Sequence, residues 1–168
     1  MNKRGFTLVE LLAVIVIMAI ILTIAIPSSI DAYKKSKLKA EYSFVKRLSE
    51  AVDNYTTLNT DKITFTQYGQ KTKIDTDNIV TVYKGTISTR NLVGEELLNI
   101  KDYINPNNKD TPCNKYAEME IYKDSDFVYR HKIKVSSLSC ITNDYINEYL
   151  DGNNNSYIID TCVWKENN

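Results

Sequence analysis

The chain has 168 residues, and its 21 lysines and arginines balance its 21 aspartates and glutamates. This length fits one small domain with an appendage. The chain has no excess of basic residues of the kind that nucleic-acid-binding domains carry. A single histidine and three scattered cysteines are too few to supply the ligands of most metalloenzyme sites. The mean hydropathy of −0.33 is misleading, because a long apolar segment precedes a polar remainder. An ordinary soluble globule is therefore excluded.

Residues 6–26 form an apolar run whose only polar members are Thr7, Glu10 and Thr23. As a helix, this run would be about 32 Å long, which is enough to cross the hydrocarbon core of a membrane. A cleaved secretory signal explains it poorly, because such apolar regions usually have about 7–15 residues and end at a small-residue cleavage site. A plain membrane anchor explains everything except Glu10.

Glu10 is the most informative residue of the sequence. A carboxylate inside a membrane costs about 2.5–3.5 kcal/mol on insertion scales, so it indicates a function by default. No cationic side chain lies within one helical turn after it. If the chain were cut before Phe6, the new amine would lie about one turn away, and the amine of a neighbouring subunit would serve equally well. Pairing would remove the unsatisfied charge and so drive association.

The run from Lys3 to Glu10, KRGFTLVE, followed by an unbroken apolar helix, resembles the class III prepilin leader of type IV pilins and pseudopilins. The resemblance implies cleavage between Gly5 and Phe6 by a prepilin peptidase, and N-methylation of the Phe6 amine. Pro27 falls where this family usually carries a helix-bending proline. The strong resemblance covers about residues 3–30. The implied domains are a leader (1–5), a long helix (6–58, hydrophobic over 6–26) and a head (59–168).

The function that the resemblance implies is that of a structural subunit of a bacterial type IV pilus. Such a subunit starts in the cytoplasmic membrane and assembles into a helical surface filament. Its partners would be other copies of itself, other pilins, the peptidase, and an inner-membrane assembly platform with its ATPase. The alternatives are a minor pilin or pseudopilin of a type II secretion or DNA-uptake system, and a membrane-anchored binding domain without a filament.

Membrane orientation is not decided by charge alone. Lys3 and Arg4 precede the apolar segment, but four lysines follow it within residues 34–39. The positive-inside rule therefore leaves the orientation ambiguous. The resemblance implies that the N-terminus is cytoplasmic and the rest lies outside.

Residues 28–58 contain no glycine and no proline, and their apolar residues recur every three or four positions. This spacing predicts one stripe of an amphipathic helix on which a small sheet packs. The members of the stripe are Leu38, Tyr42, Val45, Leu48, Val52 and Tyr55. A helix over 6–58 would be about 80 Å long, so its first half must be buried in a membrane or in other copies. Pro27 predicts a kink or local melting.

The head predicts an α+β fold with an antiparallel sheet of three to four strands on the helix stripe, as in the pilin fold. Short β-like runs lie at 63–66 and 79–83, and a helix is expected over 91–100, capped by Ser88 or Thr89. Alternating residues predict a hairpin of 117–122 with 127–135, with Phe127, His131 and Ile133 on its buried face. A further strand is expected from Tyr157 to Trp164. The predicted loop between the helix and the sheet includes two proline-containing stretches, 105–108 and 111–112.

Cys113, Cys140 and Cys162 lie in the part expected to be exported, where disulfides persist. The predicted hairpin brings Cys113 close to Cys140, so this pair is the first choice. Cys140 with Cys162 is the second, because it resembles the C-terminal disulfide loop of many pilins. The remaining cysteine is read as a small buried residue. A zinc site with His131 lacks the short cysteine spacing that such sites use.

No enzyme, cofactor, metal site or direct nucleic-acid motif is predicted. His131 alternates with apolar residues, which favours a packed histidine over a catalytic one. The acid pair Glu118/Glu120 faces away from the apolar side of its strand, which favours solvated carboxylates over catalytic ones. The sequence has no glycine-rich phosphate loop and no nucleophile elbow.

Overall fold

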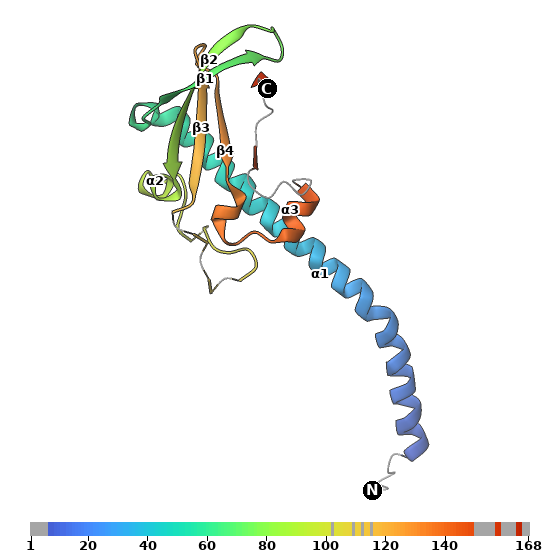
Figure 1. The fold of residues 1–168 in the computed structure, drawn as a ribbon. Helices are drawn as coiled ribbons and strands as arrows, with labels where there is room; N and C mark the ends of the chain where they lie inside the picture. The colour runs from blue at the N-terminus through green and yellow to red at the C-terminus, as the bar shows by residue number, and fades with distance from the viewer. Residues whose placement is uncertain are drawn as a thin grey trace. The chain divides into compact units, whose positions relative to one another are not determined.

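The structure is a computed structural model. It describes residues 7–101, 103–108, 110–111, 113–114, 116–149, 157–158 and 164–165. The chain divides into two compact units, Met1–Lys39 and Ala40–Asn168. The helix α1 (Leu8–Leu58) begins in the first unit and ends in the second (Figure 1).

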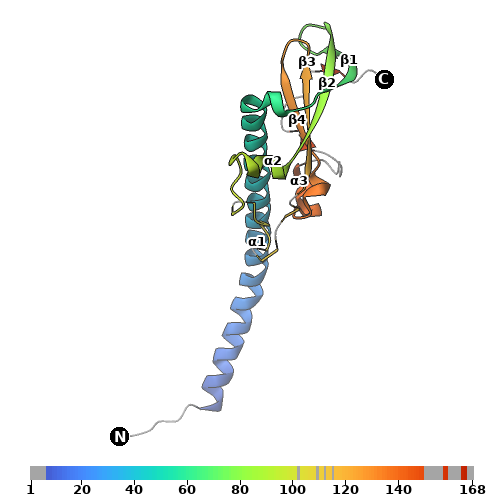
Figure 2. The ribbon, with the colours of Figure 1, turned by 90° about the vertical axis from the view of Figure 1, so that its left-hand side faces the viewer.

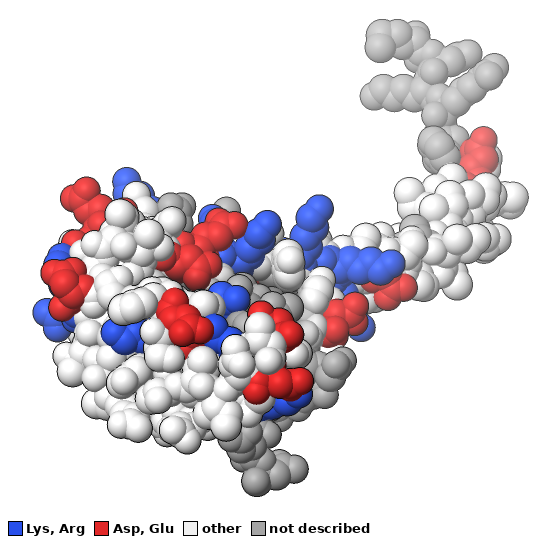
Figure 3. Space-filling view, turned by 90° about the horizontal axis from the view of Figure 1, so that it is seen from above, with Lys and Arg blue, Asp and Glu red and all other residues white. Residues whose placement is uncertain are grey.

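In the first unit, α1 exposes its apolar side chains all round. The large hydrophobic residues from Leu8 to Ile26 keep 44–81% of their surface exposed. By length and composition, α1 is able to cross a membrane. In Figure 3 its N-terminal stretch is almost entirely white, whereas charged side chains gather on the rest of the molecule. A helix that is hydrophobic all round needs lipid or other helices around it.

The helix runs without interruption through Pro27. Local melting, one of the two effects expected there, is absent from the described helix. Proline has no N–H, so the carbonyl of Thr23 loses its usual intrahelical donor. The Thr23 hydroxyl itself donates to the Ala19 carbonyl at 2.7 Å.

In the second unit, one face of α1 is buried by the head. The predicted stripe is confirmed at Val45, Leu48, Val52 and Tyr55, each at most 2% exposed. Tyr42 differs, since 40% of it is exposed and its ring lies at the edge of the buried face. The α+β class is therefore confirmed, with the packing face of the helix where its periodicity placed it.

The sheet is antiparallel and, within the described residues, has six strands in the order β5-β4-β3-β2-β1-β6. Its longer strands are β1 (Thr66–Lys73), β2 (Ile79–Ser88), β3 (Glu118–Asp124) and β4 (Tyr129–Ile133). The two edge strands, β5 (Tyr157–Ile158) and β6 (Trp164–Lys165), have two residues each. Four strands match the prediction of three to four, and the short edge strands extend it. The paired β1 and β2 lie at one end of the head in Figure 1.

The predicted single strand from Tyr157 to Trp164 is wrong. β5 pairs with β4 at one edge of the sheet, and β6 pairs with β1 at the opposite edge. One straight strand cannot occupy both edges. Trp164 instead packs on Val80 and Val82, on the face of the sheet that points away from Ile121 and Ile133.

The β3–β4 hairpin is confirmed, with Met119 opposite Ile133 and Ile121 opposite His131. Phe127 was expected on the buried face, but it is 71% exposed and has a φ of 61°. Strand pairing ends at Lys123 and Tyr129, so Phe127 belongs to the turn. The turn is held by Asp124.

Two short helices differ from expectation. α2 (Thr89–Gly94) begins after Ser88, whose N–H and hydroxyl both donate to Asn91 Oδ1. It ends at Gly94, earlier than the predicted residue 100, and Glu96 adopts a left-handed φ of 58°. α3 (Asn143–Tyr149) was not predicted. In the view of Figure 2, α2 crosses in front of α1, and α3 lies to the right of α1. Two 3-10 turns, Thr60–Lys62 and Val135–Leu138, complete the described elements.

Candidate functional site

The start of α1 holds Glu10 in a reciprocal hydrogen-bonded cap with Thr7. The Thr7 N–H and hydroxyl donate to Glu10 Oε2 at 2.8 and 2.9 Å, and the Glu10 N–H donates to Thr7 Oγ1 at 3.3 Å. This is a capping box, which satisfies N–H groups that the first helical turn leaves without partners. The spacing Thr-x-x-Glu is the sequence signal of this capping box.

The capping box gives the Glu10 carboxylate polar partners within its own chain. Gly5 and Phe6, the predicted cleavage and methylation residues, lie outside the described residues. The pairing of Glu10 with the amine of Phe6 therefore stays a prediction. Pro27 lies inside α1, as its position in the sequence implied.

In the head, His131 lies between two residues of α1. Its Nδ1 lies 2.8 Å from Asp53 Oδ1, and its Nε2 lies 2.9 Å from Ser49 Oγ. Because a carboxylate only accepts, neutral His131 donates from Nδ1 and its Nε2 accepts the Ser49 hydroxyl. The histidine is 2% exposed, which agrees with its expected place on the buried face of the hairpin.

A serine, a histidine and an aspartate in this order are the groups of a hydrolase triad. Ser49, however, is only 2% exposed, so its hydroxyl is closed to a substrate carbonyl. The chain of hydrogen bonds instead ties α1 to β4. The four-residue spacing of Ser49 and Asp53 on one helix face was the signal that could have revealed it.

Glu41 is a second buried polar anchor on α1. It is fully buried, and its carboxylate accepts from the Thr142 N–H at 3.1 Å, the Thr142 hydroxyl at 3.0 Å and Asn107 Nδ2 at 2.5 Å. Thr142 directly precedes α3, and Asn107 also donates to the Cys140 carbonyl at 3.2 Å. One carboxylate thus holds α3 and the loop around residue 107 against the helix.

Comparison with known families finds one match, at the N-terminus of the chain. Residues 1–26 match the prokaryotic N-terminal methylation motif, a class III signal typical of type IV pilins and pseudopilins. The chain therefore carries an N-terminal leader similar to that of type IV pilin-like proteins. Proteins of this kind are generally non-enzymatic structural subunits. Searches of curated proteins and of solved structures find no match.

The motif has consequences for the processing and location of the chain. It implies processing by a prepilin peptidase and filament assembly. Together with the apolar helix, it indicates a membrane location first and a surface filament afterwards.

The disulfide of the head joins Cys113 to Cys140, with 5.3 Å between their Cα atoms. The first choice is confirmed, and the alternative of Cys140 with Cys162 is wrong because Cys140 is already bonded. The β3–β4 register, extended outward, places Cys113 opposite residue 139. The pairing therefore closes the open end of the hairpin. Cys162 lies outside the described residues.

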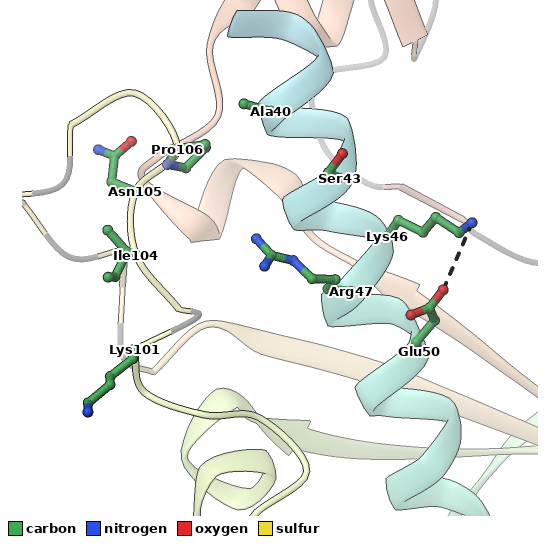
Figure 4. A pocket seen from close by; sticks show the side chains of 9 residues that line it. All are labelled: Ala40, Ser43, Lys46, Arg47, Glu50, Lys101, Ile104, Asn105 and Pro106. Atoms are coloured by element: carbon green, nitrogen blue, oxygen red, sulfur yellow. Dashed lines mark ion pairs between the residues drawn. The ribbon is translucent and has the colours of Figure 1, made fainter. Parts of the chain in front are cut away.

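A groove opens between α1 and the loop at residues 101–106 (Figure 4). Its volume is about 610 Å³. The lining residues are Ala40, Ser43, Lys46, Arg47, Glu50, Lys101, Ile104, Asn105 and Pro106. In Figure 4 the Arg47 side chain extends from the helix toward the loop. The groove was not predictable from the sequence, because its two walls lie more than fifty residues apart.

Proposed function

We propose that this protein is a structural subunit of a bacterial type IV pilus. In this proposal a prepilin peptidase cuts between Gly5 and Phe6 and the new amine is methylated. The N-terminal helices then bundle into a filament, and the heads form its outer wall. The observation that carries the proposal is the match over residues 1–26 joined to a helix whose apolar side chains are exposed all round.

The physics of the exposed helix supports this reading. Burial of apolar surface is worth about 25 cal/mol per Å², so residues 8–26 must lie in lipid or against other helices. The inner-membrane assembly platform and its ATPase would move subunits from the first environment to the second. The apolar surface stays covered in both, which makes the transfer feasible.

Glu10 would set the axial register of the filament. Before assembly, the capping box with Thr7 satisfies part of its hydrogen-bonding capacity. In the filament its carboxylate would pair with the Phe6 amine of a neighbouring subunit, a stronger, charge-assisted contact. Such a contact joins different surfaces of two copies, and repetition of it without closure generates a helical fibre.

The proposal is tested by mass spectrometry of the protein purified from its host. The expected result is a mature chain that begins at methylated Phe6, found in abundance among filaments sheared from cells. A chain that still begins at Met1 would overturn the proposal and favour a membrane-anchored binding domain. A processed chain present only in trace amounts in the sheared fraction would indicate a minor pilin or pseudopilin of a secretion or DNA-uptake system.

A further inference from the structure

The groove between α1 and residues 101–106 is basic and partly apolar. Lys46, Arg47 and Lys101 line it together with a single acid, Glu50. Glu50 lies 4.0 Å from Lys46, and both side chains are more than 60% exposed, so this pair is weak. Neither Arg47 nor Lys101 forms an ion pair with another described residue. The groove therefore presents uncompensated positive charge beside the apolar side chain of Ile104.

A surface of opposite character lies on another side of α1. Asp144 and Glu148 are both exposed and, being four residues apart on α3, share a helix face. Beside them, Tyr149 is 44% exposed, and its ring stacks on Tyr42 with 5.3 Å between centroids. We call these four residues the acidic–aromatic face. The described residues offer no ion pair to either of its carboxylates.

The two surfaces of one molecule cannot meet each other. At 100° per residue, Tyr42 lies about 140° around α1 from Arg47. The buried contacts of Glu41 hold α3 and the loop near residue 107 in place on the helix. A second copy of the chain, however, can present its acidic–aromatic face to the groove.

We propose that the groove receives the acidic–aromatic face of a second copy of this chain. The arginine would pair with a carboxylate and stack on a tyrosine ring, two contacts for which guanidinium is suited. One turn of helix, about 10 Å across and 5.4 Å long, has a volume of roughly 420 Å³ and fits a groove of this size. Because groove and face are different surfaces, the contact joins copies head to tail and propagates as an open helix. The inference rests on the proposed filament and names one of its interfaces.

Charge reversal tests the interface in the full-length protein. The variant Arg47→Glu with Lys101→Glu places like charges in the contact, and so does Asp144→Lys with Glu148→Lys. We expect each to lower the amount of sheared filament by roughly tenfold or more, since like charges at an interface are strongly unfavourable. The four substitutions together should restore it. Arg90→Glu with Lys134→Glu, at exposed positions outside the groove, changes the net charge equally and should have little effect.

If the fourfold variant restores the filaments, each pair of substitutions is compatible with folding. The loss of filaments in each double variant would then be a defect of assembly. Normal filaments from both single sets would overturn the interface, and so would failure of the combined variant to restore them. Loss with only one of the two sets would show that the groove and the acidic–aromatic face are not partners.

Cross-linking separates this interface from the filament itself. A carbodiimide joins an ammonium to a carboxylate in direct contact, so treated cells should yield a peptide linking Lys101 to Asp144 or Glu148. The matched control is the chain with Lys101→Arg, which cannot form the link. Cross-linked copies in membranes without any filament would support the interface and contradict the proposed function. Filaments that form without the cross-link and tolerate charge reversal would support the proposed function and contradict the interface.

Discussion

The two parts of α1 use the same helical backbone in opposite ways. Residues 8–26 are apolar on every side and exposed, whereas residues 40–58 bury one stripe and expose charged residues on the other side. Val45 and Val52 are fully buried, but Val9 is 73% exposed. The same residue type thus has different surroundings according to whether the chain itself supplies a cover.

This difference shows where the missing partner must be. The head completes the second part of the helix within one molecule. The first part has no cover among the described residues, so its cover comes from lipid or from other copies. Stability is thus an intramolecular property in the head and an intermolecular one in the N-terminal segment. The effect of a substitution should therefore be measured as a change in unfolding free energy in the head, and as a change in filament assembly in the N-terminal segment.

The largest effect is expected for Glu10→Ala, which removes the carboxylate that we propose meets a neighbour's amine. Filaments sheared from cells should fall to near the detection limit, because an amine left without its partner is strongly unfavourable at a buried interface. The matched control is Thr7→Ala, which removes the capping partner at a cost of about 1 kcal/mol but keeps the charge. If Glu10→Ala assembles as the unmodified protein does, the proposed pairing fails. If Thr7→Ala is equally defective, the capping box explains the role of Glu10.

The disulfide should matter for the head and not for the membrane segment. Replacing Cys113 and Cys140 by serine should lower the free energy of unfolding by about 3–4 kcal/mol, the chain-entropy value for a loop of this length. The sequence separation of the two cysteines is 27. Denaturant unfolding of the purified full-length protein in detergent measures the change. Cys162→Ser is the control and should leave the Cys113–Cys140 bond intact; its loss there would contradict the pairing.

A smaller effect is expected at the buried histidine that ties the helix to the sheet. His131→Ala should cost about 2–4 kcal/mol, because it removes packing and leaves the Ser49 hydroxyl without its partner. Ser49→Ala should cost about 1 kcal/mol. The double variant should cost less than the sum of the two, since they share one hydrogen bond. Strict additivity in unfolding experiments would contradict the Ser49–His131 bond.

The smallest effect is expected at the surface of the sheet. Burial alone would raise the pKa of Glu120, but hydrogen bonds from Lys84 at 2.6 Å and from the Tyr122 hydroxyl at 2.6 Å hold it below its usual value. A lowered pKa means that the carboxylate stabilises the fold above about pH 4.3, its unfolded value, and that this is lost as the pH falls through the folded pKa.

For this half-buried pair at the sheet surface the contribution should be about 1 kcal/mol or less. It is measured as the difference in unfolding free energy between the unmodified protein and Glu120→Gln. That difference should be present at pH 7 and shrink toward pH 3. An effect that grows on acidification would contradict the sign of the shift.

Features with a local signal were predictable from the sequence. The stripe on α1 follows from the spacing of Val45, Leu48 and Val52, and the β3–β4 hairpin follows from strict alternation. The disulfide followed in turn from the hairpin, because strand pairing brings distant residues opposite each other. The methylation motif was recognisable because its residues are contiguous.

The predictions that proved wrong concern residues whose conformation is decided by tertiary contacts. Phe127 keeps the alternation of the strand, but Asp124 Oδ1 accepts from the N–H groups of Asp126 and Val128 at 2.9 Å each and turns the chain there. Trp164 continues an apparent strand, yet it pairs across the sheet with β1. Strand propensity carries no information on which edge a segment joins.

The sequence by itself determined that this protein has a membrane-length helix with a prepilin leader and an α+β head, because contiguous motifs and periodic burial are written in neighbouring residues. Only the tertiary structure decided that Glu41 and His131 anchor the helix, and that a basic groove opens beside it. These features join residues up to 101 positions apart in the chain. Their partners are chosen by the packing of helix on sheet, for which no local pattern exists.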